Sequence, residues 1–289
     1  MKTVKTSILL VSVLCCHLVS AQKSNETITK ELGFSSNSSE NMLVVQNVNG
    51  PIRVEGYDGN TIKIEVEKTI SAKNQNSLDE GKRDIEVKIE EVGNRIYVYF
   101  ESPWNHFDTS KGRYANRKNN DRWEQPKYRY YLDFKLKVPK NTNVKLATMN
   151  DGDIYAKNVQ GDELIVSNLN GAITLDNVSG KTDVNALNKD INITYYKNPS
   201  GDSSYHSLNG DVNVTFKDDL NADVSFKSLN GDMYTNYDTA KLSPELVQTK
   251  TKNGKKVKYN MSSNQSYRIG SGGIKLDFNL LNGDATIKK

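Results

Sequence analysis

The side chains best suited to binding a ligand lie in one stretch of the chain, residues 101–127. This stretch is rich in Asn, Arg and Asp, and it interrupts a regular alternation of apolar and polar residues, as a long loop or extended hairpin would. The stretch and the residue directly after it supply Trp104, His106, Phe107, Tyr114, Trp123 and Tyr128. Exposed aromatic side chains on a loop can stack on sugar rings or anchor a protein partner. They can equally fold back to cover an open flank of the protein, and the sequence leaves both roles open.

Carboxylates recur through the second half of the chain. They are Asp151, Asp153, Asp162, Asp176, Asp183, Asp190 and Asp211. A glycan-cleaving enzyme needs paired carboxylates, or a carboxylate-bound calcium ion beside a basic residue. These aspartates instead follow the period of the turns, where Asp is favoured by local hydrogen bonding. We therefore expect no catalytic residue and no enzyme activity.

The sequence predicts neither a metal site nor a cofactor. The segment Asn150-Asp151-Gly152-Asp153 lacks the spaced ligands and terminal glutamate of a calcium-binding EF-hand loop. His106 and His206 lie on segments of different character, with no third ligand in evidence. A serine nucleophile in the strained turn typical of hydrolases is also missing.

Residues 1–21 have the features of a secretory signal peptide. Lys2 and Lys5 precede an apolar run, and Val19-Ser20-Ala21 resembles a cleavage site. Both cysteines, Cys15 and Cys16, lie inside this segment, so we expect a mature chain without disulfides or thiolate chemistry. The expected location is the periplasm or the outer cell surface.

Charge and hydropathy exclude two classes of partner. The formal net charge is +4, and it falls to about +2 without Lys2 and Lys5, which is too balanced for a nucleic-acid-binding protein. After the signal peptide, no apolar stretch approaches the length that spans a membrane, so we expect no transmembrane segment.

Residues 22–142 are predicted to form an N-terminal β region. Its segments alternate apolar and polar residues, as half-buried strands do, for example from Thr61 to Ile70. The expected helix is short and polar, residues 72–83, with Asn76 or Ser77 as its cap. A further strand from Tyr130 ends at Pro139.

Residues 143–289 are predicted to form a β-solenoid of stacked repeats. The tetrad Leu-Asn-Gly-Asp/Ala recurs, and its turns contain Asn170, Gly171, Asn209, Gly210, Asn230, Gly231, Asn282 and Gly283. Asn and Gly tolerate the positive φ of a tight turn, and each tetrad precedes a short alternating run. Every second turn gives a period of about twenty residues, which is typical of a solenoid. Residues 239–268 interrupt the period and are expected to project as a hairpin.

The stacking makes three further predictions. Equivalent Asn residues should form ladders from coil to coil, and the Leu before each Asn-Gly should fill the interior of a coil corner. Lys288 and Lys289 should lie on a terminal edge strand, where charge discourages pairing with another copy. The alternative architecture is an antiparallel sandwich of hairpins with Asn-Gly turns.

The order of these features resembles that of the bacterial putative-adhesin family, an exported β-strand-repeat domain of unknown function. The matching features are the signal peptide, Asn49-Gly50 with Ile52 and Val54, Val138-Pro139-Lys140, the Gly-Asp-Ile coils from Asn150, Ile269-Gly270-Ser271-Gly272-Gly273, and Leu281-Asn282-Gly283-Asp284. The resemblance implies a parallel β-solenoid at or near the cell surface, and it implies no catalytic residues. The chain departs from the pattern in the 101–127 insert and at Lys189, where a glycine is expected.

Three functional hypotheses follow. The first is a non-catalytic adhesin or binding module for a cell-surface glycan or protein, with contacts from the 101–127 and 239–268 inserts. The second is a structural envelope protein that self-associates or partners a membrane protein. The third, a glycan-cleaving β-helix enzyme, is least favoured because no acid/base pair stands out.

Overall fold

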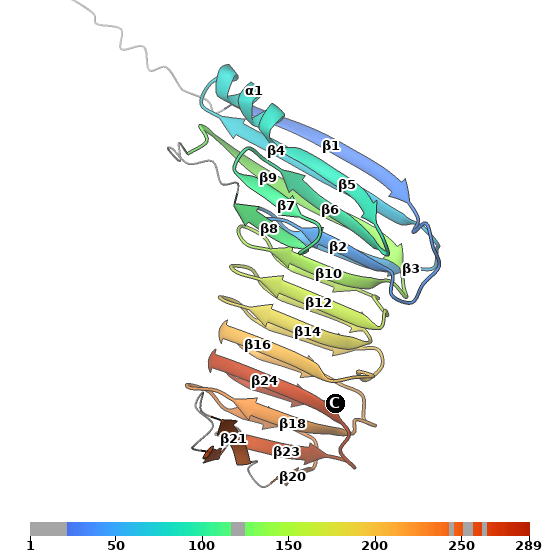
Figure 1. Ribbon diagram of the computed structural model, residues 1–289, viewed down its shortest axis with the longest axis vertical. Helices are drawn as coiled ribbons and strands as arrows, with labels where there is room; N and C mark the ends of the chain where they lie inside the picture. Colours follow the sequence, from blue (N-terminus) through green and yellow to red (C-terminus); the bar gives the residue numbers. More distant parts are fainter. Residues whose placement is uncertain (1–21, 117–124, 243–245, 251–256, 262–264) are drawn as a thin grey trace, which may run out of the picture.

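The computed structural model describes residues 22–116, 125–242, 246–250, 257–261 and 265–289. In these ranges the chain forms an elongated stack of strands in two large sheets, with a continuous apolar core between them (Figure 1). Most neighbouring strands of the stack run parallel, and one short helix lies at its N-terminal end. The predicted all-β parallel solenoid is therefore confirmed, and the sandwich of hairpins is not observed in the described part.

Sheet A contains ten strands of the described residues. In spatial order they are β1 (Gln22–Leu32), β4 (Ile62–Ala72), β9 (Tyr128–Pro139), β3 (Ile52–Tyr57), β11 (Ile154–Lys157), β13 (Ile173–Val178), β15 (Ile191–Tyr195), β17 (Val212–Thr215), β25 (Ala285–Lys288) and β19 (Met233–Thr235). β1 and β9 both pair with β4 antiparallel, and the strands from β9 to β19 are parallel neighbours.

Sheet B contains eleven strands of the described residues. In spatial order they are β20 (Thr239–Lys241), β23 (Gln265–Ile269), β18 (Ala222–Lys227), β24 (Ile274–Asn282), β16 (Ser203–Asn209), β14 (Lys181–Ala186), β12 (Glu163–Asn168), β10 (Asn143–Thr148), β2 (Met42–Gln46), β6 (Arg95–Glu101) and β5 (Glu86–Val92). The strands from β18 to β6 are parallel neighbours, whereas β20, β23 and β5 pair antiparallel.

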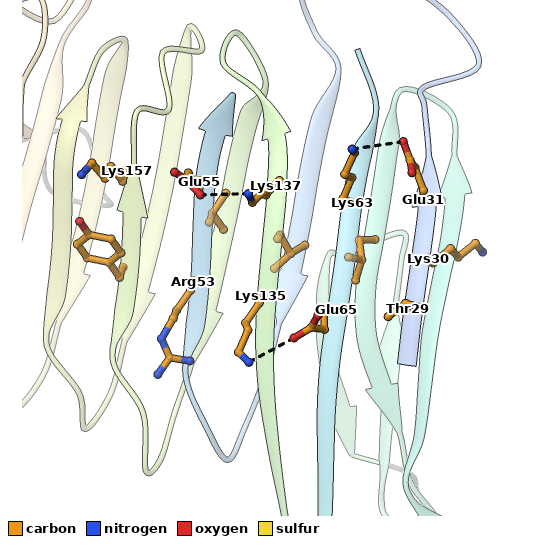
Figure 2. Close-up of a pocket in the computed structure, with 14 residues that line it drawn as sticks. Thr29, Lys30, Glu31, Arg53, Glu55, Lys63, Glu65, Lys135, Lys137 and Lys157 are labelled. Carbon is orange, nitrogen blue, oxygen red and sulfur yellow. Dashed lines mark hydrogen bonds and ion pairs between the residues drawn. The ribbon is translucent and has the colours of Figure 1, made fainter. Parts of the chain in front are cut away.

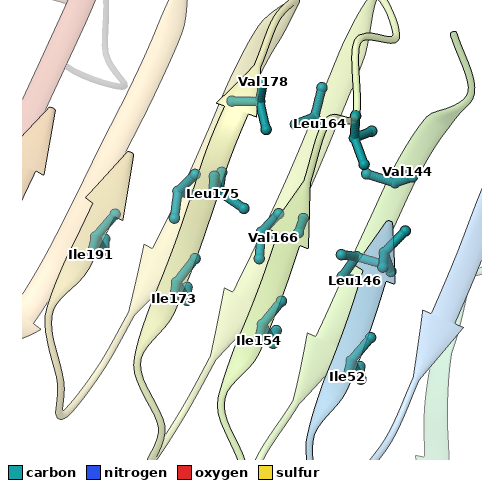
Figure 3. Packing of buried hydrophobic residues seen from close by; sticks show 14 of the residues in the cluster. Ile52, Val144, Leu146, Ile154, Leu164, Val166, Ile173, Leu175, Val178 and Ile191 are labelled. Carbon is teal, nitrogen blue, oxygen red and sulfur yellow. The ribbon is translucent and has the colours of Figure 1, made fainter. Parts of the chain in front are cut away.

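Each coil of the solenoid supplies one strand to each sheet. β10–β11, β12–β13, β14–β15 and β16–β17 follow one another in this way. Their inward positions carry Val, Leu and Ile, which meet the same residue types in the coils above and below (Figure 3). A single coil cannot bury this apolar side alone, so the stack is the unit that creates the core.

The spatial order of the coils departs from their order in the sequence. The coil β24–β25 lies between β16–β17 and β18–β19, and it pairs in parallel with both. Likewise, β2–β3 lies between the strands β6 and β9 and the coil β10–β11. The prediction that Lys288 belongs to an edge strand is therefore wrong, because β25 has a partner on each side.

An asparagine ladder runs along one corner of the stack, as the repeat predicted. In spatial order its members are Asn49, Asn150, Asn170, Asn188, Asn209, Asn282 and Asn230. From Asn150 onward, each amide nitrogen donates to the amide oxygen of the preceding rung, over distances between 2.8 and 3.3 Å. Asparagine suits this position because its amide both donates and accepts.

The leucines beside this ladder point outward, which corrects the prediction that they fill the corner. Leu169, Leu208, Leu281 and Leu229 are between 36% and 72% exposed. The residue before each leucine faces inward, and several of these are polar: Asn168 donates to the carbonyl of Gly152, and Ser207 to that of Gly210. A buried turn carbonyl needs a donor, and the alternation of a strand then places the next residue outside.

Three local elements complete the described fold. The helix α1 spans Gln75–Asp84, and its cap is Asn74, whose side chain accepts from the N–H of Ser77, rather than Asn76 or Ser77 as predicted. Within the 101–127 insert, β7 (Asn105–Asp108) and β8 (Arg113–Asn116) form a hairpin. Within 239–268, β21 (Leu246–Lys250) pairs antiparallel with β22 (Val257–Met261).

Candidate functional site

The aromatic residues of the 101–127 insert pack largely against the protein. Phe107 is buried and stacks on Tyr99, with ring centroids 4.5 Å apart. The hydroxyl of Tyr114 accepts from the N–H of Phe100 at 3.2 Å and donates to the carbonyl of Gln46 at 3.3 Å. Both contacts join the hairpin β7–β8 to sheet B, which favours a covering role for these two side chains.

The remaining predicted aromatic residues have different surroundings. Tyr128 is buried, its hydroxyl donates to Asp84 at 2.7 Å, and its ring lies 6.1 Å from that of the half-buried Trp104. His106 is exposed, with its Nδ1 3.2 Å from a carboxylate oxygen of Glu101. Trp123 lies outside the described residues. The prediction that this group binds a ligand stays a prediction.

An open groove with a volume of about 960 Å³ lies on the outer face of sheet A, over strands β1, β4, β9, β3 and β11 (Figure 2). Strand register arranges its side chains in two rows that cross the strands. The first row is Glu31, Lys63, Lys137, Glu55, Lys157 and Asp176. The second row is Thr29, Glu65, Lys135, Arg53, Tyr155 and Thr174. These two rows, which continue beyond the groove to Asp176 and Thr174 on β13, define what we call the sheet A groove.

The cations of the second row are tightly paired. Lys135 lies 2.6 Å from Glu67 and 3.3 Å from Glu65, and Arg53 pairs with Asp133. The hydrogen bond from Lys135 holds the pKa of Glu67 below its ordinary value, and Glu67 in turn raises the pKa of Lys135. Both groups therefore stay charged over a wide range of pH.

The lysines of the first row are held more loosely. The ammonium group of Lys137 lies 3.8 Å from Glu55, that of Lys157 3.9 Å from Asp176, and that of Lys63 4.0 Å from Glu31. These distances exceed a hydrogen bond, so each ammonium keeps its donors for another acceptor. Adjacent strands are about 4.8 Å apart, so Lys63 and Lys137 lie one strand apart, whereas Glu55 lies between Lys137 and Lys157.

Two partly exposed tyrosines border the groove. Tyr155 is 37% exposed and lies beside Arg53 in the second row, while Tyr131 is 39% exposed. Both line a smaller hollow of about 340 Å³ that adjoins the groove and shares Arg53 and Tyr155 with it. Burial raises the pKa of Tyr131, so its hydroxyl stays neutral. The groove thus combines cations, aromatic rings and hydroxyl groups.

The predicted turn residues lie at one corner of the solenoid, away from the lining of the groove. Asn170, Asn209, Asn230 and Asn282 belong to the asparagine ladder. Their glycines allow close approach of the coils: a Cβ on Gly171 would lie 2.0 Å from the carbonyl oxygen of Gly152.

The described ranges contain neither a metal-binding cluster nor a membrane-spanning helix. No three His, Cys, Asp or Glu side chains gather there in a way that could hold a metal ion. No helix in the same ranges is long and apolar enough to cross a membrane.

Comparison with known proteins identifies the family of this chain. The family model of Toastrack DUF4097 matches residues 133–277, from within β9 into β24, which is half of the chain. The chain belongs to the Toastrack DUF4097 family. This membership confirms the resemblance inferred from the sequence. No curated protein matches the chain.

Three solved structures are similar to this Toastrack protein at low sequence identity. A putative cell adhesion protein from Clostridium sporogenes ATCC 15579 is 10% identical, with a TM-score of 0.47 over 92% of this chain and 99% of that one. A putative adhesin from Parabacteroides merdae ATCC 43184 is 12% identical, with a TM-score of 0.30 over 92% and 95%. A putative adhesin from Bacteroides fragilis NCTC 9343 is 10% identical, with a TM-score of 0.24 over 91% and 96%.

Sequence reasoning missed the groove of the Toastrack protein. Alternating Lys and Glu along a strand indicate a solvated face. The sequence of one strand does not reveal which charged residues lie beside it on the neighbouring strands. The groove exists because register aligns Lys63, Lys137 and Lys157, which are far apart in the chain. The available signal was the basic character of strand 128–139, which has Lys135 and Lys137 at alternate positions.

Proposed function

We propose that this Toastrack protein is a non-catalytic, exported binding module of the cell surface, and that its ligand is an anionic glycan held in the sheet A groove. The observation that supports this most is the row of loosely paired lysines at 63, 137 and 157. Carboxylate, sulfate or phosphate groups on a sugar chain can accept from these ammonium groups without breaking a short ion pair in the protein.

The second row of the groove supplies the contacts that a sugar ring needs. Tyr155 offers part of an aromatic face, and it lies between the guanidinium-bearing Arg53 and the hydroxyl of Thr174. Aromatic faces pack against the apolar faces of sugar rings, while neighbouring polar groups accept and donate hydrogen bonds. A neutral ring beside cations is therefore the arrangement expected for an acidic sugar.

The shape of the groove favours a polymer over a small molecule. Its rows cross the strands, so they run along the axis of the stack and are open at the surface (Figure 2). Charged groups spaced along a chain can each meet a different lysine, and several weak contacts then add up to useful affinity. Each contact taken alone is exposed and screened by salt.

The test is binding of the protein to immobilised acidic polysaccharides, with a neutral polysaccharide as the reference ligand. Lys137→Glu combined with Lys157→Glu should weaken binding about tenfold or more, because attraction becomes repulsion at two positions of the same row. The matched control is Lys197→Glu with Lys217→Glu, which changes the net charge equally at exposed sites outside the groove. Equal weakening by both pairs, or binding that ignores the charge of the glycan, would contradict the proposal.

The aromatic insert is a separate contact surface for the same assay. Trp104 is half-buried against the core, so Trp104→Ala tests whether the insert contributes to binding. If this variant loses binding although the lysine pair is intact, the binding site lies in the insert rather than in the groove, as the sequence analysis first suggested. Thermal unfolding of the variant separates lost contact from lost packing.

Self-association is the second candidate function. The edge strand β1 is eleven residues long and pairs with β4 on one side within the described residues. An unpaired edge of this length can accept a strand from another copy, although Lys and Glu along it oppose such pairing. Sedimentation over a range of concentrations tests this: a monomer at high concentration contradicts it.

A further inference from the structure

We propose that Asn230-Gly231 is a site of spontaneous deamidation, and that the fold directs this modification to it in preference to four other Asn-Gly pairs. In the reaction, the backbone nitrogen of Gly231 attacks the side-chain Cγ of Asn230, and ammonia leaves. Water then opens the resulting succinimide ring to give aspartate or isoaspartate. The balance is one water consumed and one ammonia released.

The five Asn-Gly pairs in the described ranges begin at Asn49, Asn170, Asn209, Asn230 and Asn282. Glycine after asparagine favours ring closure because no side chain obstructs the attacking nitrogen. The sequence around four of these pairs is nearly the same, so differences between them must come from the structure.

Four of the five glycine N–H groups are engaged. Gly50 donates to the carbonyl of Asn150 at 2.9 Å, and Gly210 to that of Asn282 at 3.1 Å. Gly283 donates to the carbonyl of Asn230 at 3.1 Å, and Gly171 to the side chain of Asn168 at 3.0 Å. A nitrogen held in such a bond is positioned away from attack, and it must lose that bond before it can react.

The N–H of Gly231 has no hydrogen-bond acceptor among the described residues. The reason is topological: each of the glycines 50, 210 and 283 donates to the next coil along the stack, and β18–β19 is the last coil at this corner. Sheet A ends at β19, so the next acceptor is missing.

The side chain of Asn230 is also held on one side only, as is that of Asn49 at the other end of the ladder, where the N–H of Gly50 is engaged. The amide nitrogen of Asn230 donates to Asn282 at 2.8 Å, but its amide oxygen accepts no hydrogen bond within the described part of the chain. By contrast, the amides of Asn170, Asn209 and Asn282 are each held on both sides. The Asn230 side chain must break one hydrogen bond to turn toward Gly231, whereas an inner rung must break two.

Water has access to this end of the ladder. Asn230 is exposed, and Gly231 lines an open groove of about 670 Å³ together with Leu229 and Leu281. The nucleophile, the electrophile and the water that completes the reaction therefore meet at the last rung.

The product changes the end of the solenoid. Aspartate or isoaspartate at 230 places a carboxylate beside the amide oxygen of Asn282, where the ladder needs a donor. Isoaspartate also adds a methylene to the backbone just before β19, which pairs in register with β25. We expect β19 to loosen while the inner coils keep their pairing.

The experiment is incubation of the intact protein in mildly alkaline buffer, followed by peptide mapping that resolves each Asn-Gly pair and detects isoaspartate by enzymatic methylation. Asn230 should convert about tenfold faster than Asn49, Asn170, Asn209 and Asn282, the ratio that corresponds to one additional hydrogen bond lost. Asn253-Gly254 lies outside the described residues, so its conversion rate is measured but is not compared with the other five.

The matched control is the same protein unfolded in denaturant, where all five pairs should convert at similar rates. Equal rates at the five pairs in the folded protein would overturn the proposal, and so would a faster Asn230 that persists after unfolding. The variant Asn230→Asp, which carries the charge without the extra methylene, should show faster hydrogen exchange in β19 than the unmodified protein; an unchanged β19 would overturn the predicted consequence.

Discussion

The repeat region and the N-terminal region bury similar apolar residues, but they hold their strands in register by different side chains. Parallel coils place a residue beside its equivalent in the next coil, so a ladder residue must complement itself, as Asn does along the corner. In the antiparallel strands β4 and β9, opposite charges can face each other, as Lys135 and Glu65 do, although Lys63 faces Lys137 in the same pair of strands. Identical charges would repel in the first setting, whereas opposite charges attract in the second.

The largest expected difference between the regions concerns glycine. In the repeat region, Gly171→Ala would place a Cβ 2.0 Å from the Gly152 carbonyl oxygen, and the coils would have to separate. We expect a loss of about 3 kcal/mol in the free energy of unfolding. In the N-terminal region, Gly93 has a φ of +63° and open space around its Cβ position, so Gly93→Ala should cost about 1 kcal/mol. Urea denaturation of both variants makes the comparison, and equal losses would remove the distinction.

The next effect concerns a polar pair inside the apolar core of the repeat region. The hydroxyls of Tyr195 and Tyr205 lie 2.7 Å apart and are buried, so Tyr195→Phe leaves Tyr205 without this partner. We expect a loss of about 1 to 3 kcal/mol. The exposed neighbour Tyr196 provides the control, because Tyr196→Phe should leave the unfolding free energy unchanged. Thermal unfolding of the two variants decides the matter.

The same tyrosine should affect alkaline stability. Burial raises the pKa of Tyr195 to about 12, above its ordinary value of about 10. A raised pKa in the folded state gives stability that is complete below pH about 10 and lost as the pH rises toward 12. The Tyr195→Phe variant should therefore lose less free energy of unfolding than the unmodified protein between pH about 10 and 12. If the unfolding free energies of the two proteins fall in parallel with pH, this prediction is wrong.

A smaller effect is expected at the centre of the asparagine ladder. Asn188 donates to Asn170 and accepts from Asn209, both at exposed positions. Asn188→Ala should lower the free energy of unfolding by about 1 kcal/mol. Asn185→Ala removes a hydrogen bond to Asp183 within one strand and should cost less. If the two variants are equally stable, the ladder contributes nothing beyond ordinary surface bonds.

The smallest effect concerns the ion pairs of the N-terminal region. Lys135 holds the pKa of Glu67 below its ordinary value, so the stability due to this pair is present above pH about 4 and is lost as the pH falls through the folded-state pKa. The urea midpoint of the Glu67→Gln variant should therefore fall slightly less on acidification than that of the unmodified protein. The difference should vanish in high salt, because the pair is exposed.

The sequence predicted local features well and long-range neighbours poorly. The alternating strands, the Asn-Gly corners and the asparagine ladder follow from the period of the repeat. The expected positive φ holds at Gly50 and Gly283 but is wrong at Gly171, Gly210 and Gly231, where the close approach of the next coil is what excludes a side chain. The outward direction of Leu169 did not follow, because it depends on the buried carbonyl of Gly152 and the inward Asn168 that donates to it. The burial of Phe107 depends likewise on Tyr99 of β6, a contact that the composition of the insert does not reveal.

The sequence by itself determined that this chain builds stacked β coils, since each repeat has one apolar side that needs a neighbour. The tertiary structure alone decided which coils become neighbours. It inserts β24–β25 between earlier coils, leaves Asn230-Gly231 as the last rung, and aligns Lys63, Lys137 and Lys157 in one groove. The physical reason is that the alternation of apolar and polar residues along a strand fixes which face each side chain takes. Strand pairing, by contrast, joins backbone groups that hardly differ between residues, so the choice of partner strand depends on the packing of the whole core.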